Sequence, residues 1–244
     1  AGWASLRPVQ EMAIPVIVQG GRDVIVAAST AAGKTEAAFF PALTRLLRQP
    51  GLLVYISPLK ALINDQQGRL QVLCGQLDLP VYPWHGDIAA PSKARFMQQP
   101  QGVLLITPES LEAMLCSKGT QIKRLFGNTR CFIIDELHAF IGSERGKQLQ
   151  AIMHRIDMEV GTPVARVGLS ATLGDMGLAA EFLRPGNGQN VEILNAPSTG
   201  NSLKVLIKGY EEPTPMTMSS AATVDSTDET FGMNDEEQEQ EPQD

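Results

Sequence analysis

Apolar and polar positions follow two alternating patterns along roughly the first 210 residues. Short, continuously apolar runs predict strands at 23–28, 52–57, 80–84, 103–107, 131–135 and 164–170, with a further candidate at 203–208. Helical spacing between these runs predicts helices at 34–47, 62–73 and 108–115, and around the apolar stripe of Leu149, Ile152, Met153 and Ile156. Strands that are apolar along their whole length are buried on both faces of a sheet.

This alternation of strands and helices predicts an α/β fold. A mostly parallel central sheet would lie between two layers of helices, as a three-layer sandwich. Ligands of such sheets bind outside the carboxyl ends of the strands. Candidate chemistry is therefore sought in the residues that follow each strand.

Length and composition fit a globular protein. With 244 residues, 43% of them hydrophobic, the chain can bury one large core or two small ones. Collagen-like, fully disordered and disulfide-stapled classes are excluded. The apolar runs are too short to cross a membrane, and no signal peptide is visible. The three cysteines are far apart without a C-x-x-C pair, which favours reduced thiols and a cytoplasmic location over disulfides or a metal site.

The charge is distributed unevenly. The net charge is −7, but residues 211–244 hold 11 acidic side chains and no Lys or Arg. Residues 1–210 therefore hold 16 acidic and 20 basic side chains, a charge of about +4, which is compatible with binding nucleic acid. We expect one domain at 1–210 and a disordered acidic tail or linker at 211–244. A competing interpretation is that the tail mimics the charge of nucleic acid and inhibits the domain.

The first predicted strand runs into a phosphate-binding loop. Residues 28–35 spell Ala-Ser-Thr-Ala-Ala-Gly-Lys-Thr, with Ala28 where the first glycine of this pattern often stands. Small residues let backbone N–H groups close around phosphates at the positive end of the following helix. Lys34 is placed to reach the β- and γ-phosphates, and the Thr35 hydroxyl to bind Mg²⁺. The other residues expected to contact the nucleotide are Ser29, Thr30, Ala31, Ala32 and Gly33. The alternative is a turn of small residues with a solvated lysine.

Two acidic residues, Asp135 and Glu136, stand at the end of the fifth predicted strand. A carboxylate at the tip of a buried strand is costly unless it meets a cation, so Asp135 is placed to hold Mg²⁺. Glu136 is placed to orient and activate an attacking water. The alternative is an ordinary acidic turn. The sixth strand ends in Ser170 and Thr172, whose hydroxyls could hydrogen-bond to the turn at 135–138.

Taken together, the motifs resemble the first RecA-like domain of superfamily 2 helicases of the DEAD/DEAH-box kind, and within them the Lhr-like and Ski-like helicases. The resemblance extends from about Trp3 to Tyr210. It rests on the glutamine motif at 8–10, the phosphate loop at 28–35, motif Ia at 57–62, a His-Gly-Asp element at 84–87, motif Ib at 107–111, the DExH motif at 135–138 and motif III at 170–172. Segments 57–62, 107–111 and 170–172 disfavour an unrelated phosphate-loop switch or transporter ATPase.

The resemblance implies a role for each matching residue. Gln10 would bind adenine, and Lys34, Asp135 and Glu136 would form the catalytic set for ATP. His138, Ser170 and Thr172 would couple hydrolysis to domain movement. The phosphate backbone of single-stranded DNA or RNA would be held by Pro58, Lys60, Thr107, Pro108 and Ser110. Contacts of this kind carry no base information, so little sequence specificity is expected.

Two departures from the family pattern are visible. Ala31 and Ala32 stand where many helicases have Gly-Ser or Gly-Ala, and alanine tolerates a positive φ less well than glycine. After Tyr210 we find no second RecA-like domain and no Gln/His-x-x-Gly-Arg-x-Gly-Arg element, which supplies the arginine fingers of this superfamily. The expected function is the N-terminal ATP-binding domain of an ATP-dependent DNA or RNA helicase, truncated and weakly active alone. The alternative is a non-catalytic remnant that binds nucleic acid or a helicase partner.

Overall fold

A single parallel sheet organises the described part of the chain. The computed structural model describes residues 5–29, 32–171 and 175–195. Within them the strands are β1 Val24–Ala27, β2 Leu52–Ile56, β3 Val81–Trp84, β4 Gly102–Ile106, β5 Thr129–Ile134, β6 Ala165–Ser170 and β7 Glu192–Asn195. Their order is β3-β4-β2-β5-β6-β1-β7, and every pairing is parallel. The predicted α/β fold is confirmed.

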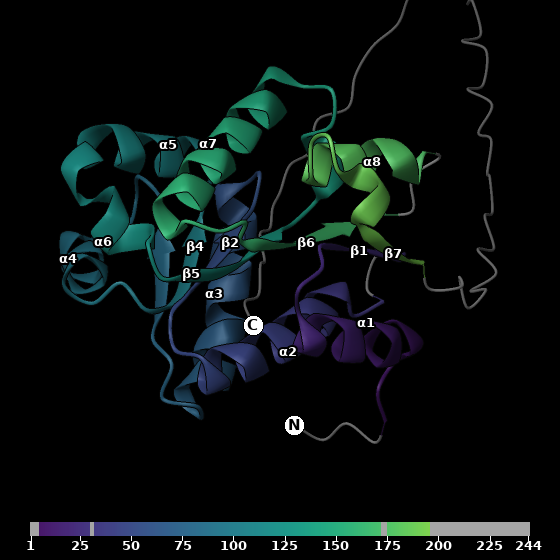
Figure 1. Cartoon of the computed structure of the whole chain (residues 1–244). Coiled ribbons are helices and arrows are strands. Elements are labelled where there is room, and N and C mark those ends of the chain that lie inside the picture. The colour runs from purple at the N-terminus through teal and green to yellow at the C-terminus, as the bar shows by residue number, and fades with distance from the viewer. Residues whose placement is uncertain (1–4, 30–31, 172–174, 196–244) are drawn as a thin grey trace, which may run out of the picture. The chain divides into compact units, whose positions relative to one another are not determined.

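Helices cover both faces of the sheet (Figure 1). They are α1 Pro8–Gln19, α2 Lys34–Arg48, α3 Lys60–Gly75, α4 Ala90–Gln98, α5 Pro108–Ser117, α6 Ile122–Phe126, α7 Glu144–Val160 and α8 Met176–Leu183. Short 3₁₀ turns lie at Gly119–Gln121, Leu137–Ala139 and Gly188–Asn190. None of these helices combines the length and the apolar composition that crossing a membrane requires.

The core has two parts, one on each face of the sheet. Helices α1, α2 and α3 pack on one face, with Phe39 and Leu43 of α2 among the buried residues. Helices α4 to α8 pack on the other, with Leu149 and Ile152 of α7 buried there. Successive residues of β1, β2, β4 and β5 contribute to opposite parts, because side chains alternate across a strand. Strands β1, β2 and β4 are buried at every position, as their continuous apolar runs predict.

The six main strand predictions and the helix predictions at 34–47, 62–73 and 108–115 are confirmed to within about two residues, and the helix predicted around Leu149 to Ile156 is α7. Helices α1, α4, α6 and α8 and strand β7 were not predicted. Pro15 lies inside α1 and obscures its pattern, and only Leu194 of β7 is buried, so pairing with β1 rather than apolar content fixes that strand. The candidate strand at 203–208 and the tail at 211–244 lie outside the described residues.

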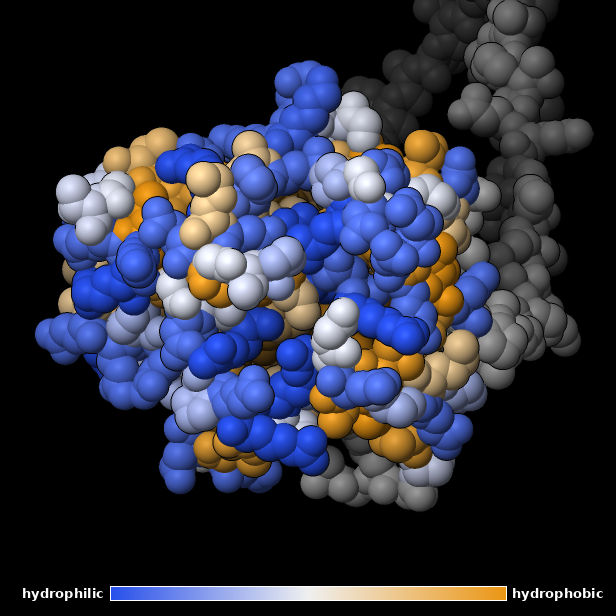
Figure 2. Space-filling model, in the orientation of Figure 1, coloured by the Kyte–Doolittle hydropathy of each residue, from blue (hydrophilic) through white to orange (hydrophobic). Residues whose placement is uncertain are grey.

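All three cysteines are free thiols, as the sequence predicts. Cys74 and Cys131 are buried, and Cys116 is exposed. Burial raises the pKa of the Cys74 thiol to about 11 and that of Cys131 to about 12. Both buried thiols are therefore protonated at neutral pH and act as small apolar residues. The face of the molecule in Figure 2 is largely hydrophilic, with apolar patches separated by polar residues.

A buried ionic cluster lies near the amino ends of β1 and β6. Arg166 is only 3% exposed, and its Nη2 lies 2.6 Å from Asp157 Oδ2. Arg184 Nη2 donates to Asp23 Oδ1 at 2.8 Å, and the same carboxylate oxygen accepts the backbone N–H of Arg166 at 2.8 Å. These four charged side chains join the start of β1, the end of α7, β6 and the end of α8. Their mutual pairing makes the burial of charge tolerable.

Candidate nucleotide site and nucleic-acid-binding edge

Nearly all of the predicted site residues gather at one edge of the sheet. Because all strands are parallel, the segments that follow β1, β2, β4, β5 and β6 leave the sheet at the same edge. Motifs separated by more than a hundred residues in sequence therefore become neighbours. Thr30, Ala31 and Thr172 lie outside the described residues, so the structure does not place them.

Gly33 shapes the phosphate loop at the start of α2. Its φ of +89° lies in the left-handed region, which glycine enters without strain. A Cβ at this position would lie 2.8 Å from the side-chain nitrogen of Gln10 and 3.2 Å from Cδ of Arg7. Both the backbone conformation and the close approach of α1 therefore require glycine here.

Lys34 folds back over the loop. Its Nζ donates to the backbone carbonyls of Ala28 at 2.7 Å and Ser29 at 3.0 Å. Burial lowers the pKa of Lys34, and the nearby carboxylates of Glu136 and Asp135 partly offset that effect. The lysine of the loop and the acidic pair after β5 therefore act on each other electrostatically. A phosphate oxygen could take the place of the two carbonyls.

Gln10 connects α1 to the loop. It is 3% exposed, and its Oε1 accepts the backbone N–H of Arg7 at 3.0 Å. Its amide nitrogen lies beside Gly33. The side chain thus has a fixed position next to the phosphate loop, with its amide oxygen already engaged.

Asp135 is a buried carboxylate at the end of β5. It is 8% exposed; Oδ2 accepts the hydroxyl of Tyr55, and Oδ1 accepts the backbone N–H of Glu136 at 2.9 Å. Burial raises the pKa of Asp135, although these two hydrogen bonds act in the opposite direction. Tyr55, from the middle of β2, was not predicted as part of the site. The only signal in the sequence is one tyrosine in an otherwise aliphatic run.

Glu136 has an unusual backbone conformation. Its φ of +47° is rare for a residue with a side chain, and such strain is found preferentially at functional sites. The side chain is 40% exposed, with Oε2 lying 3.4 Å from Nδ1 of His138. Glu136 is therefore open to solvent beside the buried Asp135.

The donor set suits a magnesium ion and a polyphosphate. Within the described ranges, no ion pair joins Asp135 to a basic side chain, although the carboxylate is buried. A bound cation would supply the missing charge. Carboxylate and hydroxyl oxygens, here from Asp135 and Thr35, are the ligand type that Mg²⁺ prefers. The residues present therefore fit the predicted group.

Substituting Asp135 with asparagine should stabilise the chain in the absence of nucleotide and metal. The amide keeps an acceptor for Glu136 and a partner for Tyr55 but removes a buried charge, so we expect a gain of about 1 kcal/mol in the free energy of unfolding. Urea unfolding of both proteins measures this. A loss of stability would show that the ionised carboxylate contributes favourably.

The hydrogen bond predicted between Ser170, at the end of β6, and the turn after β5 is not formed. The buried Ser170 hydroxyl has no hydrogen-bond partner in the described part of the chain, so its predicted bond to the turn at 135–138 is not formed. Leu137 instead fixes that turn by packing onto Gly168, where a Cβ would come within 2.8 Å of the leucine. The missing Cβ of Gly168 leaves the room that Leu137 occupies.

The remaining predicted residues form a second stretch of the same edge. Thr107 caps α5, its Oγ1 accepting the backbone N–H of Ser110 at 3.3 Å and lying 3.1 Å from the Ser110 hydroxyl. Pro108 is the first residue of α5, and Pro58 follows β2. Lys60 begins α3 with a side chain 55% exposed, and its Nζ lies 3.2 Å from Asp87.

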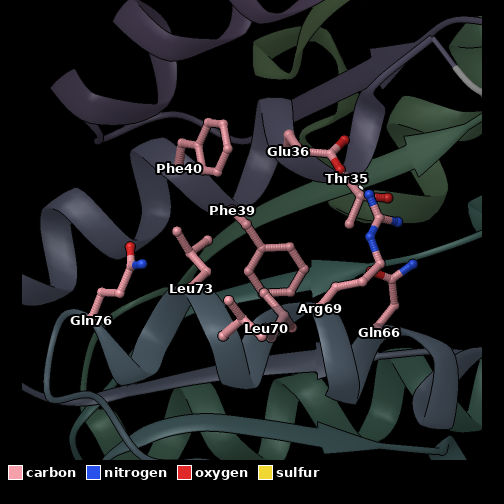
Figure 3. Close-up of a pocket in the computed structure, with 10 residues that line it drawn as sticks. Thr35, Glu36, Phe39, Phe40, Gln66, Arg69, Leu70, Leu73 and Gln76 are labelled. Carbon is pink, nitrogen blue, oxygen red and sulfur yellow. Dashed lines mark hydrogen bonds and ion pairs between the residues drawn. The ribbon is translucent and has the colours of Figure 1, made fainter. Parts of the chain in front are cut away.

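A pocket of about 270 Å³ lies between α2 and α3, close to the phosphate loop (Figure 3). Phe39, Leu70 and Leu73 point into it, and Thr35 lies at one end. An ion pair between Arg69 and Glu36 joins the two helices at that end. The mainly apolar lining does not suit phosphate groups, so this pocket is distinct from the loop above it.

A parallel sheet with a phosphate loop after β1 and an acidic pair after β5 defines a RecA-like nucleotide-binding domain. Residues 7–178 match the family described as DEAD/DEAH box helicase. The chain belongs to this family.

Named relatives agree with this assignment. The chain is 36% identical over 198 residues to "Lhr helicase/uracil glycosylase" of Escherichia coli, covering 71% of this chain and 12% of that protein. It is 32% identical over 206 residues to "ATP-dependent helicase Lhr-Core" of Sulfolobus acidocaldarius, covering 78% and 23%. The chain thus spans less than a quarter of either relative.

Solved structures show the same fold. The structure of Mycobacterium smegmatis helicase Lhr bound to ssDNA and AMP-PNP matches with a TM-score of 0.69 and 33% identity, covering 80% of this chain and 26% of that one. The DEAD-box helicase Mss116 bound to ssRNA and UDP-BeF matches with a TM-score of 0.68 at 19% identity, covering 80% and 41%. The second match supports the fold alone.

Proposed function

We propose that this chain is the ATP-binding domain of an ATP-dependent helicase, in which ATP hydrolysis drives movement along single-stranded nucleic acid. The observation that carries the proposal is that the phosphate loop after β1 and the acidic pair Asp135 and Glu136 after β5 leave the parallel sheet at the same edge. The names and bound ligands of the Lhr relatives support the same activity.

In this proposal each residue of the nucleotide site has its own task. Lys34 exchanges its two carbonyl partners for phosphate oxygens of ATP, while backbone N–H groups of residues 29–33 surround the phosphates. Thr35 and Asp135 hold Mg²⁺, which when bound neutralises charge on the phosphate oxygens. Glu136, exposed beside them, orients the attacking water and accepts its proton. Gln10 contacts adenine with its amide nitrogen.

The second stretch of the edge would hold one strand of DNA or RNA. The exposed Lys60, the hydroxyls of Thr107 and Ser110, the turn at Pro58 and the first residue of α5, Pro108, suit a phosphate backbone. The N-terminus of α5 adds its partial positive charge. These contacts read no bases, so the chain should bind single strands with little sequence preference.

A second RecA-like domain would complete the cleft, whether or not it is part of the same polypeptide. In the proposal His138, 41% exposed, and the hydroxyls of Ser170 and Thr172 transmit the state of the nucleotide to that domain. The domain boundary at about residue 210 and a linker role for 211–244 are parts of the same proposal. Free thiols throughout are compatible with a cytoplasmic location.

ATPase measurements on the chain test the proposal. We expect binding of a fluorescent ATP analogue with Mg²⁺, but negligible turnover with or without single-stranded DNA or RNA. The reason is that an arginine finger contributes about 10³- to 10⁵-fold in related reactions. Glu136→Gln should bind the analogue as the unmodified chain does.

Two outcomes would contradict this expectation. Failure of the folded chain to bind any adenine nucleotide would remove the ATP-binding role. Strong turnover that one nucleic acid stimulates and Glu136→Gln abolishes would show that the site is already complete, for example through a second copy of the chain.

A further inference from the structure

Arg145 joins three segments of the nucleic-acid-binding edge. It is the second residue of α7, the helix that follows β5. Its Nη2 donates to the carbonyl of Pro58, after β2, at 2.6 Å. The same nitrogen donates to Oε2 of Glu109, in the first turn of α5, at 3.0 Å, and Nε pairs with the other carboxylate oxygen. One guanidinium thus connects the segments that follow β2, β4 and β5.

Contacts with the turn that precedes α7 also hold the guanidinium in place. Its Cζ lies 5.6 Å from the centre of the Phe140 ring, within the range of a cation–π contact. The next residue is glycine because a Cβ there would approach the Phe140 carbonyl oxygen to 1.9 Å, so the backbone of α7 lies directly against this turn. Ser143 caps the helix by accepting the N–H of Gly146 at 3.0 Å. The start of α7 is therefore fixed relative to Phe140.

The carboxylate of Glu109 puts a negative charge beside the residues proposed to bind phosphate groups, and Arg145 neutralises it. The carboxylate lies in the same helical turn as Thr107 and Ser110, which the proposed function assigns to phosphate groups. Partial burial would raise the pKa of Glu109, but the hydrogen bonds and the charge of Arg145, together with hydrogen bonds from Thr107 and the backbone, leave the pKa lowered. The carboxylate is therefore charged at neutral pH, and without Arg145 it would repel a nucleic-acid strand.

Arg145 could either contact a phosphate of the strand directly or hold the residues that do. Nε and Nη2 of Arg145 already donate to Glu109 and Pro58, and the side chain is 36% exposed. A direct contact with a phosphate would have to use Nη1. A positioning role would need only the contacts that the structure shows.

We propose that Arg145 is a positioning residue for nucleic-acid binding: it fixes the Pro58 turn and the first turn of α5 in one arrangement and neutralises Glu109, without contacting the strand itself. This inference rests on the proposed function, because it requires that this edge binds a single strand. The two Arg145 contacts bring Pro58 and Lys60 on one side, and Thr107 and Ser110 on the other, into a fixed spacing. A strand whose phosphates are regularly spaced needs that spacing.

The test compares binding of fluorescent oligo-dT and oligo-U to the 244-residue chain across a series of salt concentrations. Arg145→Ala should weaken binding about tenfold, equivalent to about 1.4 kcal/mol. Arg145→Lys, which keeps the charge but not the fork, should weaken it about threefold, since a lysine cannot hold both partners in this geometry. The slope of log affinity against log salt should stay unchanged in both variants, because no phosphate contact is lost.

A second substitution separates the two parts of the role. In Arg145→Ala, adding Glu109→Gln removes the uncompensated carboxylate, and we expect this to recover about threefold of the lost affinity while the lost link to Pro58 persists. Arg155→Ala is the matched control, because Arg155 joins the same two helices through a 2.9 Å pair with Glu112, away from the sheet edge. That variant should bind nucleic acid as the unmodified chain does.

Several results would overturn the proposal. A fall of about 0.7 in the salt slope on Arg145→Ala would show that Arg145 itself contacts a phosphate of a single strand. Unchanged affinity in both variants would remove any role. If Arg145→Lys also lost affinity for the ATP analogue to the same extent as for the oligonucleotides, or lost thermal stability, Arg145 would have a general structural role instead. If the unmodified chain bound neither oligonucleotide, the proposed nucleic-acid-binding function would be wrong. The role of Arg145, which depends on that function, would then be wrong too.

Discussion

Replacing Lys34 with alanine is expected to weaken binding of an ATP analogue with Mg²⁺ on the order of 100-fold. Hydrogen bonds to charged groups contribute about 1.5–3 kcal/mol each, and an ammonium group that faces several phosphate oxygens makes more than one. The fold should be unaffected, since the hydrogen bonds that Lys34 Nζ makes to other described residues are those to the carbonyls of Ala28 and Ser29. Fluorescence anisotropy of the labelled nucleotide measures the affinity, and thermal unfolding checks the fold.

Lys147→Ala is the matched control for this variant. Lys147 is 71% exposed, and its one ion pair in the described part of the chain is with Glu144 on its own helix, so removing it deletes the same charge without touching the loop. It should leave nucleotide affinity unchanged. Equal affinities of Lys34→Ala and the unmodified chain would mean that residues 28–35 are not the phosphate site, and the proposed function would then lose its main support.

Replacing Asp157 with alanine is expected to lower the free energy of unfolding by about 3–5 kcal/mol, the range found when one partner of a buried ion pair is removed. Asp157 accepts from Arg166 Nη2 at 2.6 Å, from Arg184 Nη1 at 3.3 Å and from the backbone N–H of Val164 at 2.8 Å. Without it, Arg166 keeps its charge at 3% exposure, and its guanidinium loses its only ion pair among the described residues. Domains of this kind are stable by only about 5–15 kcal/mol in total.

Urea unfolding followed by circular dichroism measures this loss. Glu144→Ala serves as the control, because Glu144 lies on the same helix and its side chain is 91% exposed, so its removal should change stability little. A loss for Asp157→Ala as small as that of the control would mean that water reaches the cluster and screens it. Nucleotide affinity, measured below the unfolding transition, should be retained, since the cluster lies at the amino ends of the strands.

The local features of the fold and the site follow from the sequence. The strand, phosphate loop and helix around residues 24–48 are continuous in the chain, so the apolar run, the small residues and the Gly-Lys-Thr specify them together. The same holds for the end of β5, where two acidic residues directly follow a buried run. Parallel packing of such strands then requires that these segments share one edge.

Weak local patterns explain what was missed. Helix α1 contains Pro15, and only one residue of β7 is buried, so neither carries a clear period. Strand β7 exists because the open side of β1 offers unpaired backbone groups, with Val24–Ala27 pairing residue by residue with Glu192–Asn195. That pairing joins segments more than 160 residues apart, which no local signal can specify.

The sequence by itself determined the class of fold, the phosphate loop and the acidic pair, because these depend on neighbouring residues and on the period of apolar positions. Only the tertiary structure decided the side-chain partners across the edge. The Tyr55 hydroxyl meets Asp135 across 80 residues of chain, and Arg145 meets Pro58 across 87. The lateral order of the strands sets these contacts, and that order results from packing the whole sheet and its helices at once.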